Sequence, residues 1–240
     1  MRRLPAVRRT LVLRAARRLS PAVRELTFDT DDGAPFDRLA GQWVKLFLAD
    51  GLERDYSIAD AFDPQDPGRV TLAVTRVEGG PGSEALHRME PGTRVDSLGP
   101  NGLFVRTDAE RAMPALYVGT GTGLAPLRAM LQEELARGEG PPQTLLFGGR
   151  TEDDRLWADE LARVAVAFPR LQVVTTLSRP GAAWTGPRGH VQAHLPARLA
   201  ATPGAHVYVC GLSSMVLDVR RLLKETLGVD RRNIHSERYD

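Results

Sequence analysis

The stretch Ala115-Leu-Tyr-Val-Gly-Thr-Gly-Thr-Gly-Leu-Ala-Pro126 decides the fold of the second half of the chain. Its first four residues are an apolar run typical of a buried strand, and the apolar residues from Leu124 onward recur at helical spacing. Glycines between a strand and a helix let backbone N–H groups approach an anion at the helix N-terminus, where the helix dipole favours phosphate. The turn is therefore a candidate nucleotide-binding loop, and the alternative is a tight turn without a ligand. The candidate residues are Gly119, Thr120, Gly121, Thr122 and Gly123.

The loop differs from two common nucleotide motifs. Leu124 stands where the third glycine of the G-x-G-x-x-G fingerprint belongs, and the Lys-Ser/Thr ending of a Walker loop is missing. The strand that follows ends at Arg150, and no carboxylate stands there. The loop alone therefore indicates an anion site without naming the nucleotide.

Strands and helices alternate through this half of the chain. Apolar runs predict further strands at 144–147, 171–177 and 206–210. A helix is predicted after Thr151, and another is predicted to be capped by Ser213 or Ser214 and stopped by Gly228. Such alternation predicts a doubly wound α/β domain with a parallel sheet over residues 109–240.

The first half has a different pattern, and the two meet near residues 107–114. Short runs rich in β-branched and aromatic residues are separated by Asp-Gly and Pro-Gly turns, which predicts an antiparallel β-barrel or sandwich over residues 1–108. One helix is predicted from Ser83 to Met89. The predicted strands are 10–14, 23–28, 43–48, 70–76 and 95–98.

Composition narrows the class of protein. The formal net charge is +2, and no apolar run approaches the roughly 18 residues of a membrane-spanning helix. We therefore expect a cytoplasmic monomer that does not bind nucleic acid and does not insert into a membrane. Eight arginines and no carboxylate precede residue 25, which is either a basic docking face or a solvated strand edge. Cys210 is the only cysteine, which excludes a disulfide within the chain and a thiolate-ligated iron–sulfur cluster on it.

Four motifs resemble those of the ferredoxin–NADP⁺ reductase superfamily, in the order of that family and over nearly the whole chain. Arg54-Asp-Tyr-Ser57 resembles its flavin motif, and Gly119-Thr-Gly-Thr-Gly-Leu-Ala-Pro126 resembles its pyridine-nucleotide phosphate motif. Cys210-Gly211 is similar to its Cys-Gly at the nicotinamide, and Gly99-Pro-Asn-Gly-Leu-Phe104 to the turn that closes its flavin barrel. The resemblance implies a six-stranded antiparallel flavin barrel followed by a five-stranded parallel sheet.

The flavin motif has a physical interpretation. Arg54 offers a planar fork suited to the flavin pyrophosphate. Tyr56 offers a ring that can stack on the isoalloxazine or hydrogen-bond the ribityl chain, and Ser57 can donate to flavin N5. Gly82 and Ser83, ahead of the predicted helix, would supply a second contact to the pyrophosphate.

The candidate residues for binding the nicotinamide lie in the second half of the chain. Cys210 ends a predicted parallel strand, where such folds bind ligands, and Gly211 leaves room for the ring. Near the C-terminus, Glu237 and Tyr239 resemble the terminal Glu-x-Tyr of plant-type relatives, although Asp240 follows the tyrosine. We expect Ser57, Cys210 and Glu237 to be the catalytic residues and Tyr239 to lie over the flavin. A frayed, functionless tail is the alternative.

These residues predict a flavoprotein that transfers hydride between NAD(P)H and bound FAD, with FMN the less favoured flavin. The candidates for binding the NADPH phosphate are Arg150, Ser178 and Arg179. The sequence therefore slightly favours NADPH over NADH. The expected partner is a one-electron carrier such as a ferredoxin, a flavodoxin or an oxygenase component. An NAD(P)H:flavin reductase and a non-catalytic nucleotide-binding subunit are the alternatives. No metal site is expected, because His190 and His194 lack a third ligand.

Overall fold

The computed structural model describes residues 4–239. The chain divides into two compact units. The first unit contains the residues up to Arg106 together with residues 128–133, and the second contains residues 107–127 and 134–240.

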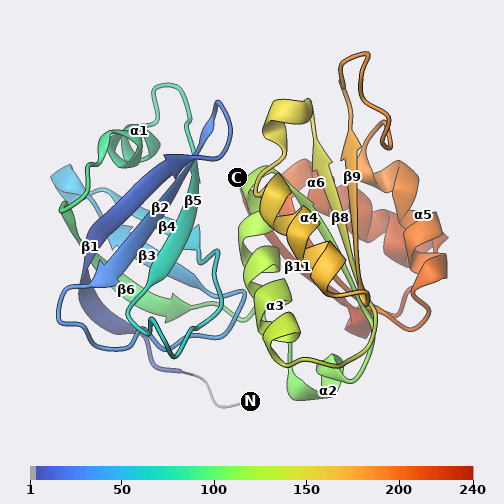
Figure 1. The fold of residues 1–240 in the computed structure, drawn as a ribbon, viewed down its shortest axis with the longest axis horizontal. Coiled ribbons are helices and arrows are strands. Elements are labelled where there is room, and N and C mark those ends of the chain that lie inside the picture. The colour runs from blue at the N-terminus through green and yellow to red at the C-terminus, as the bar shows by residue number, and fades with distance from the viewer. Residues whose placement is uncertain (1–3, 240) are drawn as a thin grey trace. The chain divides into compact units, whose positions relative to one another are not determined.

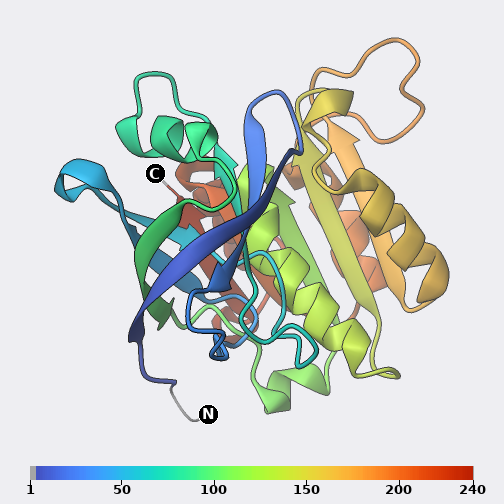
Figure 2. The same cartoon turned by 60° about the vertical axis from the view of Figure 1, so that its left-hand side comes forward.

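The first unit is a nearly closed antiparallel barrel with the strand order β4-β3-β6-β1-β2-β5. The edge strands β4 and β5 approach each other at a bridge between Ile58 and Leu72. In the barrel wall, β1 (dark blue) lies between β2 and β6 (Figure 2). The strands are β1 (Val7–Arg18), β2 (Val23–Thr30), β3 (Trp43–Phe47), β4 (Glu53–Ser57), β5 (Val70–Thr75) and β6 (Arg94–Asn101).

The barrel exists because alternate residues of its strands are apolar and point to one side. Leu11 and Leu13 of β1, Leu26 and Phe28 of β2 and Leu72 of β5 are almost fully buried in one cluster. Burial of such side chains contributes about 1.5–3 kcal/mol each. The unit therefore has a hydrophobic core of its own.

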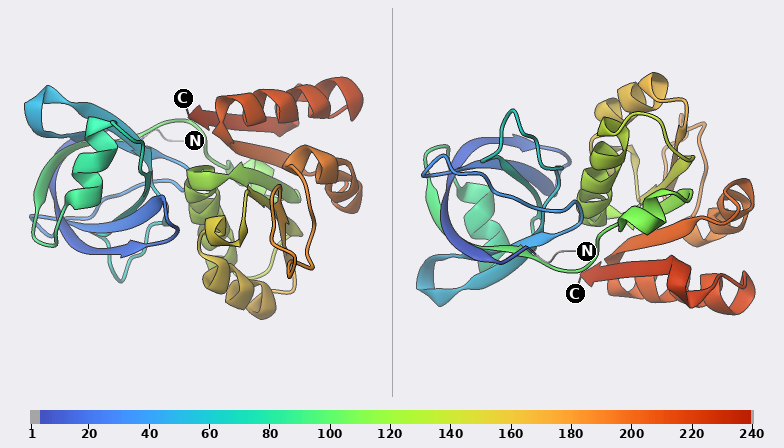
Figure 3. Two further views of the ribbon diagram at one scale, coloured as in Figure 1. Left: turned by 90° about the horizontal axis from the view of Figure 1, so that it is seen from above. Right: turned by 90° about the horizontal axis from the view of Figure 1, so that it is seen from below.

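Helix α1 (Pro81–Arg88) lies across one end of this barrel (Figure 3). It begins two residues earlier than the predicted start at Ser83, because Pro81 occupies the first turn, where a missing N–H does no harm. The Ser83 hydroxyl accepts a hydrogen bond from the Val77 N–H at 3.0 Å, so it orders the turn before the helix. Gly80 is the N-cap residue.

Three of the arginines at the start of the chain form ion pairs within the barrel. Arg9 pairs with Asp32, Arg14 with Asp29 and Asp66, and Arg17 with Glu25. The pairs Arg14–Asp29 and Arg17–Glu25 join the neighbouring strands β1 and β2. For these three arginines the geometry favours a strand edge with internal ion pairs over a basic docking face.

The second unit is an entirely parallel sheet with the strand order β11-β10-β7-β8-β9 (Figure 1). Successive strands move outward from β7 to β9, and the chain then returns to place β10 on the other side of β7. Ligands bind at such a reversal, outside the carboxyl ends of the strands. The strands are β7 (Ala115–Thr120), β8 (Gln143–Gly149), β9 (Leu171–Leu177), β10 (His206–Leu212) and β11 (Ile234–Tyr239).

Helices cover both faces of this sheet, α3 and α4 on one and α5 and α6 on the other (Figure 1). Apolar residues of α5 and α6 pack on β7, β8 and β10 around Val118, Leu146 and Val209. No helix within residues 4–239 is long and apolar enough to cross a membrane. The helices are α2 (Asp108–Arg111), α3 (Leu124–Ala136), α4 (Ala158–Ala167), α5 (Val191–Ala201) and α6 (Ser213–Arg221), the last continued by a π-helical turn (Leu222–Thr226).

Two predicted helix starts in this unit were wrong in detail. Thr151 and Asp154 form the expected capping box, but it caps a 3-10 turn (Glu152–Asp154). Helix α4 begins only after Trp157, whose φ of 50° breaks the helical path. Neither Ser213 nor Ser214 caps α6, because the N-cap position falls on Leu212. Sequence spacing placed these helices correctly and their first residues wrongly.

Candidate functional site

The predicted flavin pyrophosphate residues lie side by side in the first unit. Arg54 on the edge strand β4 is exposed, and its side chain crosses the first turn of α1. A Cβ added to Gly82 would lie 2.9 Å from Arg54 Cγ and 3.2 Å from its Nε. Only glycine at position 82 therefore lets the guanidinium stem lie against the helix N-terminus. Together they combine a positive side chain with the positive end of a helix dipole, which suits a pyrophosphate.

Tyr56 and Ser57 continue the same strand toward the barrel interior. Tyr56 is half-buried and packs against the apolar core, and Ser57 is buried. Burial raises the pKa of Tyr56 to about 12, although the nearby charge of Arg54 lowers it. The phenol therefore stays protonated and can donate a hydrogen bond. The two residues are placed on a rigid strand, as a flavin ring and ribityl chain require.

The glycine loop of the second unit lies at the reversal of the strand order. Gly119 ends opposite Cys210 in the β7–β10 pairing, and the loop continues as a 3-10 turn (Gly121–Gly123) into α3. A Cβ on Gly123 would lie 2.3 Å from the Cys210 carbonyl oxygen, so only glycine allows the two segments to meet. Gly121 is exposed with a φ of +53°, and nothing lies within 4 Å of where its Cβ would be. The loop is thus closely packed against Cys210 at Gly123 and open at Gly121.

One buried hydroxyl at this edge lacks a partner within the described residues. The Thr120 hydroxyl oxygen is buried and has no hydrogen-bond partner in the described part of the chain, which costs about 1–3 kcal/mol if nothing else satisfies it. Pro126 sits in the first turn of α3, where its missing N–H is tolerated. The residues present therefore fit a phosphate-bearing nucleotide.

Strand β11 brings Cys210, Glu237 and Tyr239 together. Cys210 is fully buried and pairs in register with Glu237, and Leu212 pairs with Tyr239. Burial first, and then the charge of Glu237, raise the pKa of the Cys210 thiol well above its usual range, although a hydrogen bond with the Tyr239 side chain lowers it. The thiol is therefore neutral and cannot act as a nucleophile. The trio can pack and hydrogen-bond against a ring but cannot attack it.

The C-terminal residues are not a frayed tail. Ile234–Tyr239 forms the edge strand of the sheet, and the Ser213 hydroxyl donates to the Tyr239 carbonyl oxygen at 3.4 Å. Sequence reasoning identified Glu237 and Tyr239 from the resemblance and did not foresee their pairing with β10. Parallel pairing joins residues distant in sequence, so no local pattern could have revealed it.

The predicted NADPH-phosphate residues are also adjacent. The Arg179 N–H donates to the Arg150 carbonyl oxygen at 2.7 Å, and the Ser178 N–H donates to that of Gly149 at 3.1 Å. Both arginines are exposed, at the carboxyl ends of β8 and β9. Arg188, in the same loop region, is engaged by the carbonyls of Gly181 and Trp184. Two cations and a hydroxyl are thus available to a phosphate here.

Comparison with known proteins decides the family. Residues 10–105 match the oxidoreductase FAD-binding domain, and residues 117–221 match the oxidoreductase NAD-binding domain. A ferredoxin--NADP reductase B of Sorangium cellulosum is 48% identical over 235 residues, covering 94% of this chain and 95% of that protein. The chain belongs to the ferredoxin–NADP⁺ reductase superfamily. The predicted resemblance, the two-domain fold and the assignment as an FAD- and NAD(P)H-dependent oxidoreductase are confirmed.

More distant members of the superfamily add a second kind of relative. The ferredoxin--NAD(+) reductase component of an alkene monooxygenase system from Xanthobacter autotrophicus is 33% identical over 208 residues, covering 83% of this chain but 61% of that protein. A cytochrome P450 reductase of Amycolatopsis superposes with a TM-score of 0.89 at 26% identity, covering 98% of this chain and 70% of that one. The chain thus spans only part of these two proteins.

Proposed function

We propose that this protein oxidises NADPH and passes the electrons, through bound FAD, to a separate ferredoxin-type carrier. The observation that carries the proposal is the assembly of Cys210, Glu237 and Tyr239 at the carboxyl edge of the parallel sheet, beside the glycine loop. A neutral thiol and a nearby carboxylate are suited to holding a nicotinamide ring without reacting with it. When bound, FAD accepts a hydride at N5 and can release electrons one at a time.

In the proposed mechanism the protein positions its cofactors. Arg54, Gly82 and Ser83 would hold FAD at its pyrophosphate, Tyr56 would stack on or hydrogen-bond the flavin, and Ser57 would donate to N5. Charge-assisted hydrogen bonds of this type are worth about 1.5–3 kcal/mol each. Such positioning would hold the reacting atoms in a fixed orientation.

The second unit would do the same for the nucleotide. Gly119, Thr120, Gly121, Thr122 and Gly123 would hold the pyrophosphate at the start of α3. Cys210 and Gly211 would receive the nicotinamide, with Glu237 hydrogen-bonded beside it and Tyr239 covering the site until the nicotinamide displaces it. The neutral state of Cys210 supports a packing role.

The preference for NADPH is proposed from charge. Arg150, Ser178 and Arg179 would bind the ribose phosphate that NADH lacks. Their adjacency at the ends of β8 and β9 supports this, as does the name of the 48%-identical relative, a ferredoxin--NADP reductase.

A separate electron carrier follows from composition and relatives. These 240 residues contain one cysteine, so they cannot themselves hold a four-thiolate cluster. Relatives are named as a ferredoxin--NADP reductase and as ferredoxin reductase components of oxygenase systems. We therefore propose a ferredoxin over a flavodoxin or an oxygenase, and we propose that the reductase acts as a monomer.

The experiment is anaerobic reduction of the purified protein. Bound, yellow flavin that NADPH bleaches and an added ferredoxin re-oxidises would support the proposal, with the ferredoxin-free sample as the control. Flavin that washes out but restores NADPH oxidation when added back would indicate a flavin reductase. Failure of NADPH to bleach retained flavin would overturn the proposal.

A further inference from the structure

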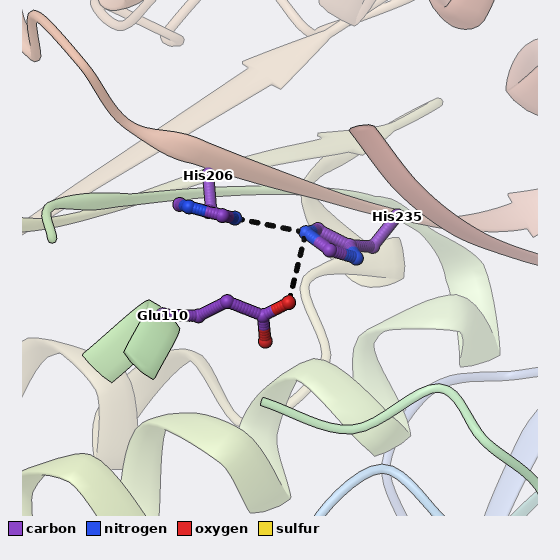
Figure 4. Close-up of side chains that lie close together, drawn as sticks. All are labelled: Glu110, His206 and His235. Carbon is purple, nitrogen blue, oxygen red and sulfur yellow. Dashed lines mark hydrogen bonds and ion pairs between the residues drawn. The ribbon is translucent and has the colours of Figure 1, made fainter. Parts of the chain in front are cut away.

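Three metal-binding side chains meet at the opposite edge of the parallel sheet, away from the glycine loop. Glu110 lies on α2, His206 is the first residue of β10, and His235 is the second residue of β11. Figure 4 shows the two imidazoles end to end, with the Glu110 carboxylate turned toward His235. Three elements far apart in sequence thus converge on one point.

The spacing of the ligand atoms fits a single ion. His206 Nδ1 lies 3.0 Å from His235 Nε2, and His235 Nε2 lies 3.7 Å from Glu110 Oε1. Ligand atoms about 2.0–2.2 Å from a tetrahedral ion lie about 3.4 Å apart, which falls between these two distances. All three atoms lie within 4.8 Å of one another. A bound ion would replace the hydrogen bond between the two imidazoles, whose nitrogens would move apart by about 0.4 Å.

Neighbouring groups already orient Glu110 and His235. The Thr107 N–H and the Tyr208 hydroxyl donate to Glu110 Oε2 at 2.7 and 3.2 Å, on the other carboxylate oxygen from the one facing His235. The His235 ring stacks on Tyr208, with centroids 4.6 Å apart and an interplanar angle of 12°. Such outer contacts tune and orient ligands in known metal sites.

We propose that Glu110, His206 and His235 form a binding site for a divalent transition-metal ion, best matched by Zn²⁺. Two imidazole nitrogens and one carboxylate oxygen favour zinc over Mg²⁺ and Ca²⁺, which take oxygen ligands. All three residues are only partly buried, so water can complete the tetrahedron.

The role of the ion follows from its place in the fold. His206 and Cys210 are four residues apart on β10, about 13 Å along the strand, so the ion cannot touch the nicotinamide. It would instead tie α2 to β10 and to the edge strand β11, which carries Glu237 and Tyr239 at its other end. The site is therefore structural, and it steadies the strand that completes the nicotinamide edge.

The test measures Zn²⁺ binding to untagged, chelator-treated protein by competition with a chromophoric chelator. The parent should bind one Zn²⁺ per chain, and the affinity should fall in acid, because only neutral imidazoles bind metal. Loss of an outer contact to a ligand weakens metal sites by about 10–100-fold, so His235→Gln and Glu110→Gln should lose at least about 100-fold. His190→Gln, which removes an exposed histidine outside the cluster, should bind as the parent does.

Two results would overturn the proposal: a parent that binds no stoichiometric Zn²⁺, or a His235→Gln protein with unchanged affinity. The first would leave the two histidines sharing a proton. If the variants fail to fold, X-ray absorption of the Zn²⁺-loaded parent decides. Two imidazole nitrogens among the ligands would support the site, and any other nitrogen count would refute it.

Discussion

Replacing Arg54 by alanine tests the flavin site most directly. The side chain lies against Gly82 at the start of α1, where a Cβ would approach its Cγ to 2.9 Å. Its removal takes away a charge-assisted contact to the pyrophosphate, worth about 2 kcal/mol, or about 30-fold in the dissociation constant of FAD. The fold should survive, because Arg54 is exposed on an edge strand. We therefore expect a folded protein that is depleted of flavin.

A matched pair of variants separates this contact from general effects of charge. Arg88→Ala removes an exposed arginine from the last turn of the same helix and should retain FAD. Gly82→Ala removes no polar group but displaces the Arg54 side chain, so it should weaken FAD by a smaller factor, about tenfold. Fluorescence titration of apoprotein with FAD measures all three. Parent-like binding by Arg54→Ala, or equal losses in Arg54→Ala and Arg88→Ala, would refute the assignment.

Four further predictions concern the remaining site residues. Cys210→Ala should slow flavin reduction by NADPH about tenfold in stopped-flow measurements while flavin content stays constant, and an unchanged rate would make the thiol purely structural. Arg179→Ala should raise the KM for NADPH about tenfold and leave the KM for NADH unchanged. Equal effects on the two KM values would show that Arg179 does not bind the phosphate. Tyr239→Ser should enlarge the absorbance change on titration with NADP⁺, because about 1 kcal/mol of ring stacking no longer competes with the nicotinamide, whereas identical spectra would place the ring elsewhere. Burial raises the pKa of Tyr56 from 10.0 to about 12, so the contribution of the buried phenol to stability is complete below pH 10 and is lost as the pH rises to 12. Between pH 9 and pH 11, the free energy of unfolding should therefore fall by about 1–2 kcal/mol less in Tyr56→Phe than in the parent, as measured by denaturant titrations. Equal falls in the two proteins would argue against a raised pKa for Tyr56.

The fold was largely predictable because both units repeat simple patterns. Alternation marked the barrel strands, and the succession of strands and helices marked the parallel sheet. The errors were local. The start of α1 moved to Pro81, and the start of α4 moved beyond Trp157, since a single left-handed residue is invisible in hydrophobic spacing. Strand β11 was missed, because half-buried edge strands such as Ile234–Tyr239 carry weak apolar alternation.

Site residues were predictable where they lie in one contiguous segment. They were not predictable where strand pairing brings distant segments together. The Gly119–Gly123 loop is contiguous, and its residue types alone suggested an anion site. The contiguous Arg54–Ser57 motif was identified through its resemblance to the flavin motif of the family. The neighbourhood of Cys210 depends on register with β11, and the Glu110–His206–His235 cluster joins residues up to 125 positions apart. Neither could be read from spacing along the chain.

The glycines show why residue type alone cannot locate a site. Gly92 and Gly228 have positive φ angles, with nothing within 4 Å of a Cβ, so they serve turns. Gly82 and Gly123 need no unusual φ, and a Cβ on either would collide with Arg54 or with the Cys210 carbonyl oxygen. At each of the two candidate anion sites, a glycine without a side chain therefore lets another segment lie against the start of a helix. Gly82 and Gly123 allow this close approach, whereas Gly121, in the same loop as Gly123, has a φ of +53° and an open Cβ position, so it provides backbone freedom.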